Sequence, residues 1–189
     1  MRNEIAVWAF VLAAGGGLLA GAPGSRAQTS TADAELKPGL AVCYMYEFVR
    51  HVDEFAEWEK HRKCEPGEPL PMLKYRVGLN KVLTSKSDDG VMAKITGFIH
   101  LEKAGSYAFS FESNDGVRLT IDGEMIVEDP DVHGDRYSDI GHKEVTEPGW
   151  YPLAIDYFER KNTSTLRFFW APPGAEGTFP LVPAEALAH

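Results

Sequence analysis

The residues whose types and spacing could carry chemistry lie in two stretches of the chain. One is the tripeptide Asn114-Asp115-Gly116, and the other runs from Glu128 to His142. The second stretch is rich in potential metal ligands, but their spacing matches neither an EF-hand loop, with its fixed register and terminal Glu, nor a His-x-x-x-His pair on a helix. We therefore interpret it as a solvated acidic loop. Its potential ligands are Asp129, Asp131, His133, Asp135, Asp139 and His142.

Motifs of the common catalytic sites do not occur in the sequence. It contains no Gly-x-Ser-x-Gly elbow, no Gly-x-x-x-x-Gly-Lys phosphate loop and no His-Glu-x-x-His zinc helix. Two of its many carboxylates could still form a glycosidase pair, since residue types alone allow many such pairs. We expect a protein that is not an enzyme, and keep a glycosidase built from exposed acids as an alternative.

The N-terminal segment has the features of a secretory signal. A mostly apolar run from Ile5 to Ala22 precedes Ser25 and Ala27, which have the small-residue spacing that signal peptidase requires. We predict a signal peptide over residues 1–27, a secreted or periplasmic protein, and no membrane insertion after cleavage. The alternative is an uncleaved N-terminal anchor.

Export determines how the two cysteines are interpreted. In an oxidising compartment Cys43 and Cys64 are expected to pair, because two cysteines offer too few ligands for a metal site. The bond would close a loop of about 20 residues and contribute roughly 3 kcal/mol in the chain-entropy model.

The net charge of the chain limits the classes of partner that it can bind, and its length indicates how many domains it forms. The 189 residues carry a net charge of −9, and removal of residues 1–27, with two arginines and one glutamate, changes it to −10. Such an acidic chain is a poor partner for nucleic acid or an anionic membrane. We expect a disordered leader over residues 28–38, followed by one domain over residues 39–189.

The stretch from Gly105 to Val127 must position the Asn-Asp-Gly tripeptide, and it predicts three successive strands. Aromatic residues alternate with small or polar ones from Tyr107 to Phe111, and aliphatic residues do so from Val117 to Ile121. Asp122-Gly123 is typical of a two-residue hairpin turn, which would bring Met125 and Val127 back antiparallel to Leu119 and Ile121. Asn114-Asp115-Gly116 is the other turn.

Alternation predicts further strands on both sides of this stretch. The strand over residues 92–101 is expected to pair with residues 107–111 through a turn at residues 102–105. Between residues 48 and 62, large apolar side chains recur at helical spacing, which predicts a short helix that buries them: Phe48, Val52, Phe55 and Trp58. The other expected strands cover residues 39–46, 75–83, 143–146, 150–158 and 165–170.

Several of these segments resemble the protective-antigen ("PA fourteen") domain family. The likeness covers residue 39 to the end and implies an all-β antiparallel β-sandwich or barrel with a short helix near residues 48–62. That family supplies modules to bacterial toxins, glycosidases and fungal adhesins. The similar segments are Gly105-x-Tyr107-x-Phe109, Ser113-Asn114-Asp115-Gly116-Val117-Arg118-Leu119, Ile121-Asp122-Gly123, Gly149-Trp150-Tyr151-Pro152-Leu153 and Leu181-Val182-Pro183-x-x-x-Leu187.

The resemblance also implies a ligand site at the Asn-Asp-Gly turn. In the fungal adhesin branch the matching position carries two Asp residues, joined by a cis peptide, that hold calcium, and the calcium holds sugar hydroxyls. Here Asn114 replaces the first Asp, so calcium affinity should fall. Glu159 lies near the position of a further ligand, and Asn162 in the loop beyond. The implied ligand-binding residues are Asn114, Asp115, Glu159 and Asn162, of which Asn114, Asp115 and Glu159 would hold the metal.

Two functions of different classes follow. The first is a lectin-like module that binds a glycan, with help from calcium, where the Asn114-Asp115 turn meets the loop over residues 159–164. The second is a structural or protein-interaction domain of the cell envelope, in which Asn-Asp-Gly is only favourable turn chemistry. If the protein is a lectin-like module, Asp115→Ala is expected to abolish glycan and calcium binding and to leave the fold intact.

Overall fold

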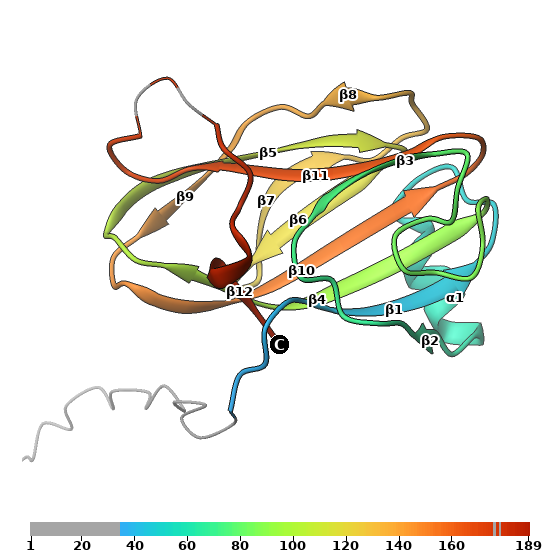
Figure 1. Ribbon diagram of the computed structural model, residues 1–189, viewed down its shortest axis with the longest axis horizontal. Helices are drawn as coiled ribbons and strands as arrows, with labels where there is room; N and C mark the ends of the chain where they lie inside the picture. Colours follow the sequence, from blue (N-terminus) through green and yellow to red (C-terminus); the bar gives the residue numbers. More distant parts are fainter. Residues whose placement is uncertain (1–34, 176, 178) are drawn as a thin grey trace, which may run out of the picture. The chain divides into compact units, whose positions relative to one another are not determined.

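The computed structural model describes residues 35–175, 177 and 179–189, which form two antiparallel β-sheets facing each other (Figure 1). The predicted signal peptide, and the expected leader up to residue 34, lie outside the described residues. One sheet has the order β2-β1-β4-β10-β6-β7, with β12 beside β4, and the other has the order β3-β11-β5-β8, with β9 beside β5. The all-β sandwich is confirmed.

The elements of the first sheet are β1 (Ala41–Tyr46), β2 (Glu65–Pro66), β4 (Val91–Leu101), β6 (Val117–Ile121), β7 (Glu124–Asp129), β10 (Gly149–Glu159) and β12 (Leu187–Ala188). Those of the second are β3 (Lys74–Gly78), β5 (Gly105–Asn114), β8 (Arg136–Tyr137), β9 (Gly141–Val145) and β11 (Ser164–Ala171). The helical elements are α1 (Glu54–His61) and the short 3₁₀ helix η1 (Ala184–Ala186).

The core lies between the two sheets and is built by the alternation seen in the sequence. Phe109 and Phe111 of β5 are fully buried, and the ring of Phe111 stacks on Phe168 of β11 with centroids 4.6 Å apart. Leu119 of β6 and Ile155 of β10 close the core from the other sheet. Full burial of a side chain of this size contributes roughly 1.5–3 kcal/mol, so the facing apolar rows hold the sheets together.

The predicted pairing of the strand over residues 92–101 with residues 107–111 is wrong. β4 pairs with β1 and β10, whereas β5 pairs with β11, β8 and β9 in the other sheet. The turn after β4 therefore carries the chain from one sheet to the other. Alternation shows that a strand has one buried face, but it does not show which strand lies beside it.

The Asn114-Asp115-Gly116 turn makes the opposite crossing, from β5 back to β6 in the first sheet. The Asp122-Gly123 turn, in contrast, joins β6 and β7 as the predicted hairpin. In that hairpin a bulge after Leu119 sets Val127 opposite Leu119 but Met125 opposite Thr120, so Met125 is exposed.

The predicted helix is shorter than expected, because α1 spans only eight residues. Phe48 lies outside it and is 55% exposed, Val52 is buried just before it, and Trp58 is half-buried. We call the cluster that α1 helps to form the second core, and its buried members are Met45, Val49, Val52, Phe55, Met92 and Phe158. The predicted disulfide between Cys43 and Cys64 is present, and Cys64 packs against this cluster.

Other boundaries also differ from the predictions. β3 ends at Gly78, whose φ of +60° turns the chain, so the predicted strand over residues 75–83 is too long. The stretch from Glu128 to His142 is not one loop, because it contains the end of β7, all of β8 and the start of β9. Lys37 exchanges two backbone hydrogen bonds of 2.8 Å with His189, so the ordered domain begins before residue 39.

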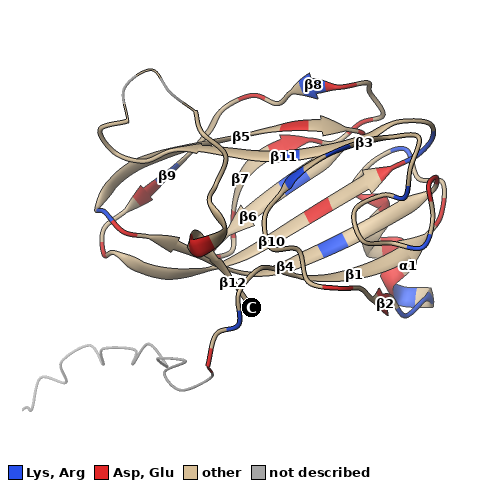
Figure 2. Cartoon of the chain, in the orientation of Figure 1, with Lys and Arg blue, Asp and Glu red and all other residues tan. Residues whose placement is uncertain are grey.

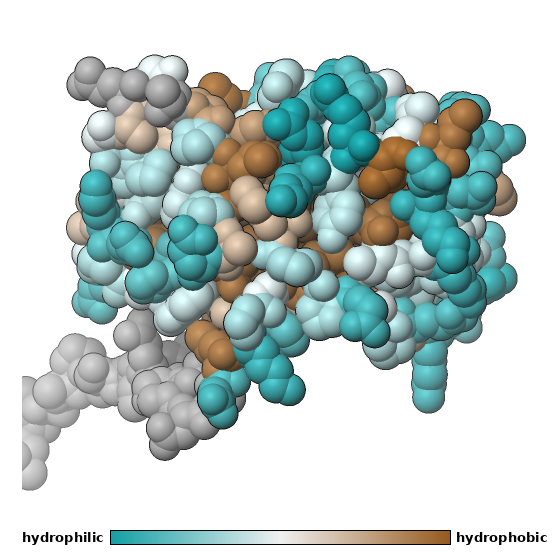
Figure 3. All heavy atoms as spheres, in the orientation of Figure 1, coloured by the Kyte–Doolittle hydropathy of each residue, from teal (hydrophilic) through white to brown (hydrophobic). Residues whose placement is uncertain are grey.

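The surface is mixed in character. Acidic and basic residues are interspersed over both sheets (Figure 2), and hydrophobic residues are visible between hydrophilic ones on the face shown in Figure 3. Scattered apolar exposure of this kind is normal for a folded domain. No helix in the described part of the chain is long and apolar enough to cross a membrane.

Candidate functional site

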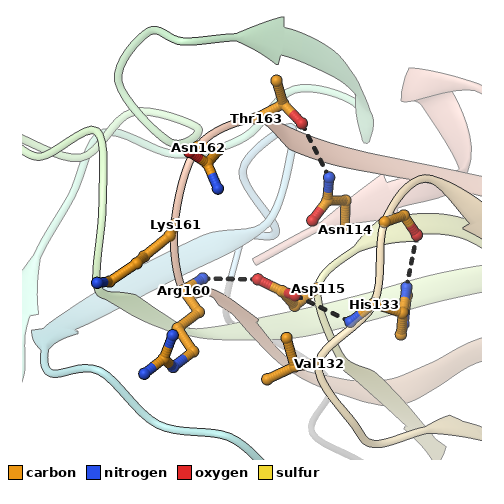
Figure 4. Close-up of a pocket in the computed structure, with 9 residues that line it drawn as sticks. Asn114, Asp115, Val132, His133, Arg160, Lys161, Asn162 and Thr163 are labelled. Carbon is orange, nitrogen blue, oxygen red and sulfur yellow. Dashed lines mark hydrogen bonds between the residues drawn. The ribbon is translucent and has the colours of Figure 1, made fainter.

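A pocket of about 410 Å³ opens where β5 ends, β10 ends and β11 begins (Figure 4). Three segments line it: the turn after β5, the loop between β7 and β8, and the loop between β10 and β11. The lining residues are Asn114, Asp115, Val132, His133, Gly134, Arg160, Lys161, Asn162 and Thr163. The structure therefore brings together three of the four predicted ligand-binding residues, namely Asn114, Asp115 and Asn162.

Asp115 connects the three segments. Its Oδ1 accepts a hydrogen bond from the backbone N–H of His133 at 3.0 Å, and its Oδ2 accepts one from the N–H of Arg160 at 2.7 Å. Its own N–H donates to the carbonyl of Phe158 at 3.1 Å. The side chain is buried, and this burial raises the pKa of Asp115, while the two backbone donors act in the opposite direction.

Asn114 is joined to Asp115 by a cis peptide bond and is held by hydrogen bonds on two sides. Its Nδ2 donates to Thr163 Oγ1 at 3.0 Å and to Asp135 Oδ1 at 3.2 Å, and its carbonyl accepts from the Tyr157 hydroxyl at 2.7 Å. Both amide protons are thus used within the protein. This pattern leaves the side-chain oxygen of Asn114 as the atom available to a ligand.

Glu159, the fourth predicted residue, is not among the residues that line the pocket. It is fully buried, and neither of its carboxylate oxygens has a hydrogen-bond partner among the described residues. Burial, and then the nearby charges of Asp89 and Asp115, raise the pKa of Glu159 to about 8. The nearby backbone amide of Gly90 acts to lower the pKa of Glu159. Its N–H donates a hydrogen bond to the carbonyl of Arg160 at 3.1 Å.

Other buried polar groups share this lack of partners. The hydroxyls of Ser113 in β5 and Ser164 in β11 are buried and have no hydrogen-bond partner within the described part of the chain. Ser113 is the last residue but one of β5, and Ser164 begins β11, so both lie beside the pocket. Unpartnered buried polar atoms are uncommon in folded proteins, so this end of the sandwich is polar where the rest of the core is apolar.

Sequence reasoning did not assign six of the nine lining residues to the site: Val132, His133, Gly134, Arg160, Lys161 and Thr163. Arg160, Lys161 and Thr163 flank Asn162 in one loop, so the predicted loop over residues 159–164 already contained them. His133 comes from the stretch that we interpreted as solvated. Only the fold of β7 and β8 brings its backbone N–H to Asp115.

The donor atoms of the pocket have the chemistry that a hard cation such as calcium requires. Asn114 and Asn162 offer amide oxygens, and Asp115 offers the one carboxylate in the lining. Among the described residues, no three His, Cys, Asp or Glu side chains gather as a metal ion would need. A calcium ion at this turn would therefore be held by Asn114 and Asp115 with few charged ligands, which favours weak binding.

Solved structures similar to this one share its fold. The PA14 domain of the MpAFP antifreeze protein has a TM-score of 0.67 and 15% identity, with 86% of this chain and 96% of that chain covered. A PA14 sugar-binding domain from an RTX adhesin has a TM-score of 0.63 and 16% identity, with 81% and 99% covered.

A third similar structure is the A domain of epithelial adhesin 6 from Candida glabrata in complex with Galb1-3GlcNAc. It has a TM-score of 0.60 and 10% identity, and the match covers 83% of this chain and 89% of that one. No curated protein matches the sequence. The model of the PA14 domain matches residues 81–180, which include the turn, the pocket loops and most strands of both sheets. The chain belongs to the PA14 domain family.

Proposed function

We propose that this protein is a secreted, non-catalytic module that binds a glycan in the pocket at the Asn114-Asp115 turn. The observation that carries the proposal is the pocket itself, in which a side-chain oxygen of Asn114 remains free beside the fixed carboxylate of Asp115. Two similar structures support it, since one is a sugar-binding PA14 domain and the other is bound to Galb1-3GlcNAc. The disulfide agrees with an oxidising compartment.

The residues would act by orienting sugar hydroxyls. The Asn114 amide and the Asp115 carboxylate present oxygens from a turn that neighbouring loops hold in place. Asn162 faces them from the loop between β10 and β11. A calcium ion bound by this turn would supply open coordination positions for a vicinal diol.

The test is thermal unfolding with millimolar calcium and then with chelator, followed by a glycan array. Binding to the folded state raises the melting temperature, so calcium should raise it and chelator should reverse the rise. Asn114→Asp adds a carboxylate and should enlarge the calcium effect, whereas Asp115→Asn should remove it while retaining the side-chain shape. Asp122→Asn, in the exposed hairpin turn, is the matched control. Absence of any glycan binding by the folded protein would refute the proposal.

The second candidate is a structural or protein-interaction domain of the cell envelope. The backbone hydrogen bonds of Asp115 favour it, because a turn that only joins two sheets would be fixed in the same way. Binding of an envelope protein, unchanged by Asp115→Asn and by chelator, would support this function over the first.

A further inference from the structure

The pocket has a charge that differs from that of the chain around it. The chain has a net charge of −9, and five of the seven arginines in the described residues form ion pairs with Asp or Glu. Arg160 and Lys161, which both line the pocket, form no such pair within the described part of the chain. The loop between β10 and β11 that carries them is seen as a basic segment in Figure 2.

Arg160 is more than an exposed cation at the rim. Its Nε is buried and has no hydrogen-bond acceptor among the residues that the structure describes. A buried donor without an acceptor is unfavourable, and guanidinium groups are best satisfied by the paired oxygens of a carboxylate, sulfate or phosphate. An anionic ligand in the pocket can pair with the terminal nitrogens of Arg160, which are not among the buried atoms.

Lys161 adds a second positive charge on the same wall. Its Nζ lies 5.5 Å from the centroid of the Phe48 ring, a contact that orients the ammonium group without neutralising it. Figure 4 shows that the side chains of Arg160 and Lys161 extend from the same loop, on the side away from Asn114.

The acid in the pocket lining leaves these cations available. Asp115 is the one Asp or Glu among the lining residues, and its two oxygens accept hydrogen bonds from backbone amides rather than from a side-chain cation. The pocket thus has an oxygen-rich wall at Asn114 and Asp115 and a cationic wall at Arg160 and Lys161.

We infer that the pocket selects acidic glycans, in which a sugar ring lies against Asn114 and Asp115 while a carboxylate or sulfate substituent contacts Arg160 and Lys161. The inference rests on the proposed function and specifies its ligand class. Charge-assisted hydrogen bonds are roughly twice as strong as neutral ones, so the acidic substituent should dominate the affinity. It should also make the affinity sensitive to salt, because screening weakens partly exposed ion pairs.

The test is calorimetric titration of the full chain with matched sugars: lactose, sialyllactose and sulfated lactose. We expect each acidic sugar to bind roughly tenfold more tightly than lactose, as one added ion pair would allow, and high salt to reduce the difference. The sialylated and sulfated arms distinguish a carboxylate-selective pocket from a sulfate-selective one.

Variants separate this inference from the proposed function. Arg160→Gln and Lys161→Gln should reduce binding of the acidic sugars at least fivefold more than they reduce binding of lactose. The control is Lys81→Gln, an exposed lysine outside the pocket, which should change neither. Equal affinity of wild type for all three sugars would overturn the inference and leave the proposed function standing. Binding of none of them, with the glycan array also negative, would overturn both.

Discussion

Two turns of this domain contain the same dipeptide, Asp-Gly, within nine residues of each other, yet they form different structures. Asp122 and Gly123 adopt left-handed φ values of 52° and 76° and join β6 and β7 as a hairpin at the surface. Asp115 and Gly116 are packed inside the domain, at a crossing between the two sheets. The dipeptide therefore permits a turn, and the surrounding chain determines what the turn does.

The difference lies in the contacts of each residue. Asp115 accepts hydrogen bonds from the backbones of residues 133 and 160, which are far from it in sequence, while the Asp122 side chain is exposed. A Cβ added to Gly116 would lie 2.5 Å from a ring carbon of Phe158 and 2.7 Å from the Pro130 carbonyl oxygen. A Cβ added to Gly123 would meet nothing within 4 Å. The first turn is fixed by its surroundings and the second by its own residues.

The largest change in stability that would sharpen this comparison is expected at Glu159. This buried acid interacts electrostatically with Asp115 of the first turn. Its folded-state pKa of about 8 lies above the ordinary glutamate value of 4.5, so the folded state holds the proton more tightly than the unfolded state. The protonated Glu159 side chain makes its full contribution to the free energy of unfolding below pH 4.5, and this contribution is lost as pH rises through 8. Glu159→Gln, a neutral residue of the same shape, should remove this loss.

The measurement is the melting temperature of wild type and Glu159→Gln across this pH range in the presence of chelator. The difference between the two proteins should change in favour of the variant as pH rises. Glu147→Gln, at an exposed position, should follow wild type. Parallel curves for wild type and Glu159→Gln would show that the buried carboxyl does not titrate as stated.

The next effect is expected from removing each aspartate. Asp115→Ala leaves two backbone N–H groups of the pocket loops without their acceptor and should destabilise the protein by about 3 kcal/mol. Asp122→Ala changes an exposed residue in a left-handed conformation and should cost under about 1 kcal/mol. The expectation that Asp115→Ala leaves the fold intact stays a prediction, to which the structure adds this loss of stability. Urea unfolding measures both, and equal losses would remove the distinction between the turns.

The smallest effect is expected from the two glycines. Gly116→Ala places a methyl group against Phe158 and Pro130 and should cost about 2 kcal/mol through overpacking. Gly123→Ala has open space but an unfavourable φ, so it should cost about 1 kcal/mol. Chemical denaturation of both variants tests the order. A larger loss for Gly123→Ala would mean that the Gly116 site can relax around a side chain.

The sequence predicted the positions of the strands better than it predicted which strands pair with each other. Alternation depends on residues two positions apart, so the strands that contain Phe109 and Leu119 were predicted correctly, and both side chains are buried. The pairing of β4 with β10 joins residues that are 48 to 68 positions apart, from Leu101–Gly149 to Val91–Glu159, and no local pattern encodes it. Helix length was overestimated because Phe48 fits the helical spacing, yet the chain becomes helical only at Glu54.

The candidate site shows the same limit. Asn114, Asp115 and Asn162 were named because turn chemistry and a family resemblance are visible in short segments. His133 was interpreted as part of a solvated loop, since its contact with Asp115 depends on a loop that folds back over the turn. Glu159 was named as a ligand, but its strand directs it into the interior instead of the pocket lining.

The second core is connected to the pocket through Phe158 and Val52. Phe158 packs with Val52 and Phe55 in that cluster, and its backbone exchanges hydrogen bonds with Asp115 and Gly116. The N–H of Val52 also donates to the carbonyl of Pro130, next to the loop that contains His133. Local opening of the α1 segment would remove the packing on Phe158 and the hydrogen bond from Val52 to Pro130 at the same time. The Cys43–Cys64 bond closes the loop that carries α1, so it should also limit local opening of the Asn114-Asp115-Gly116 turn.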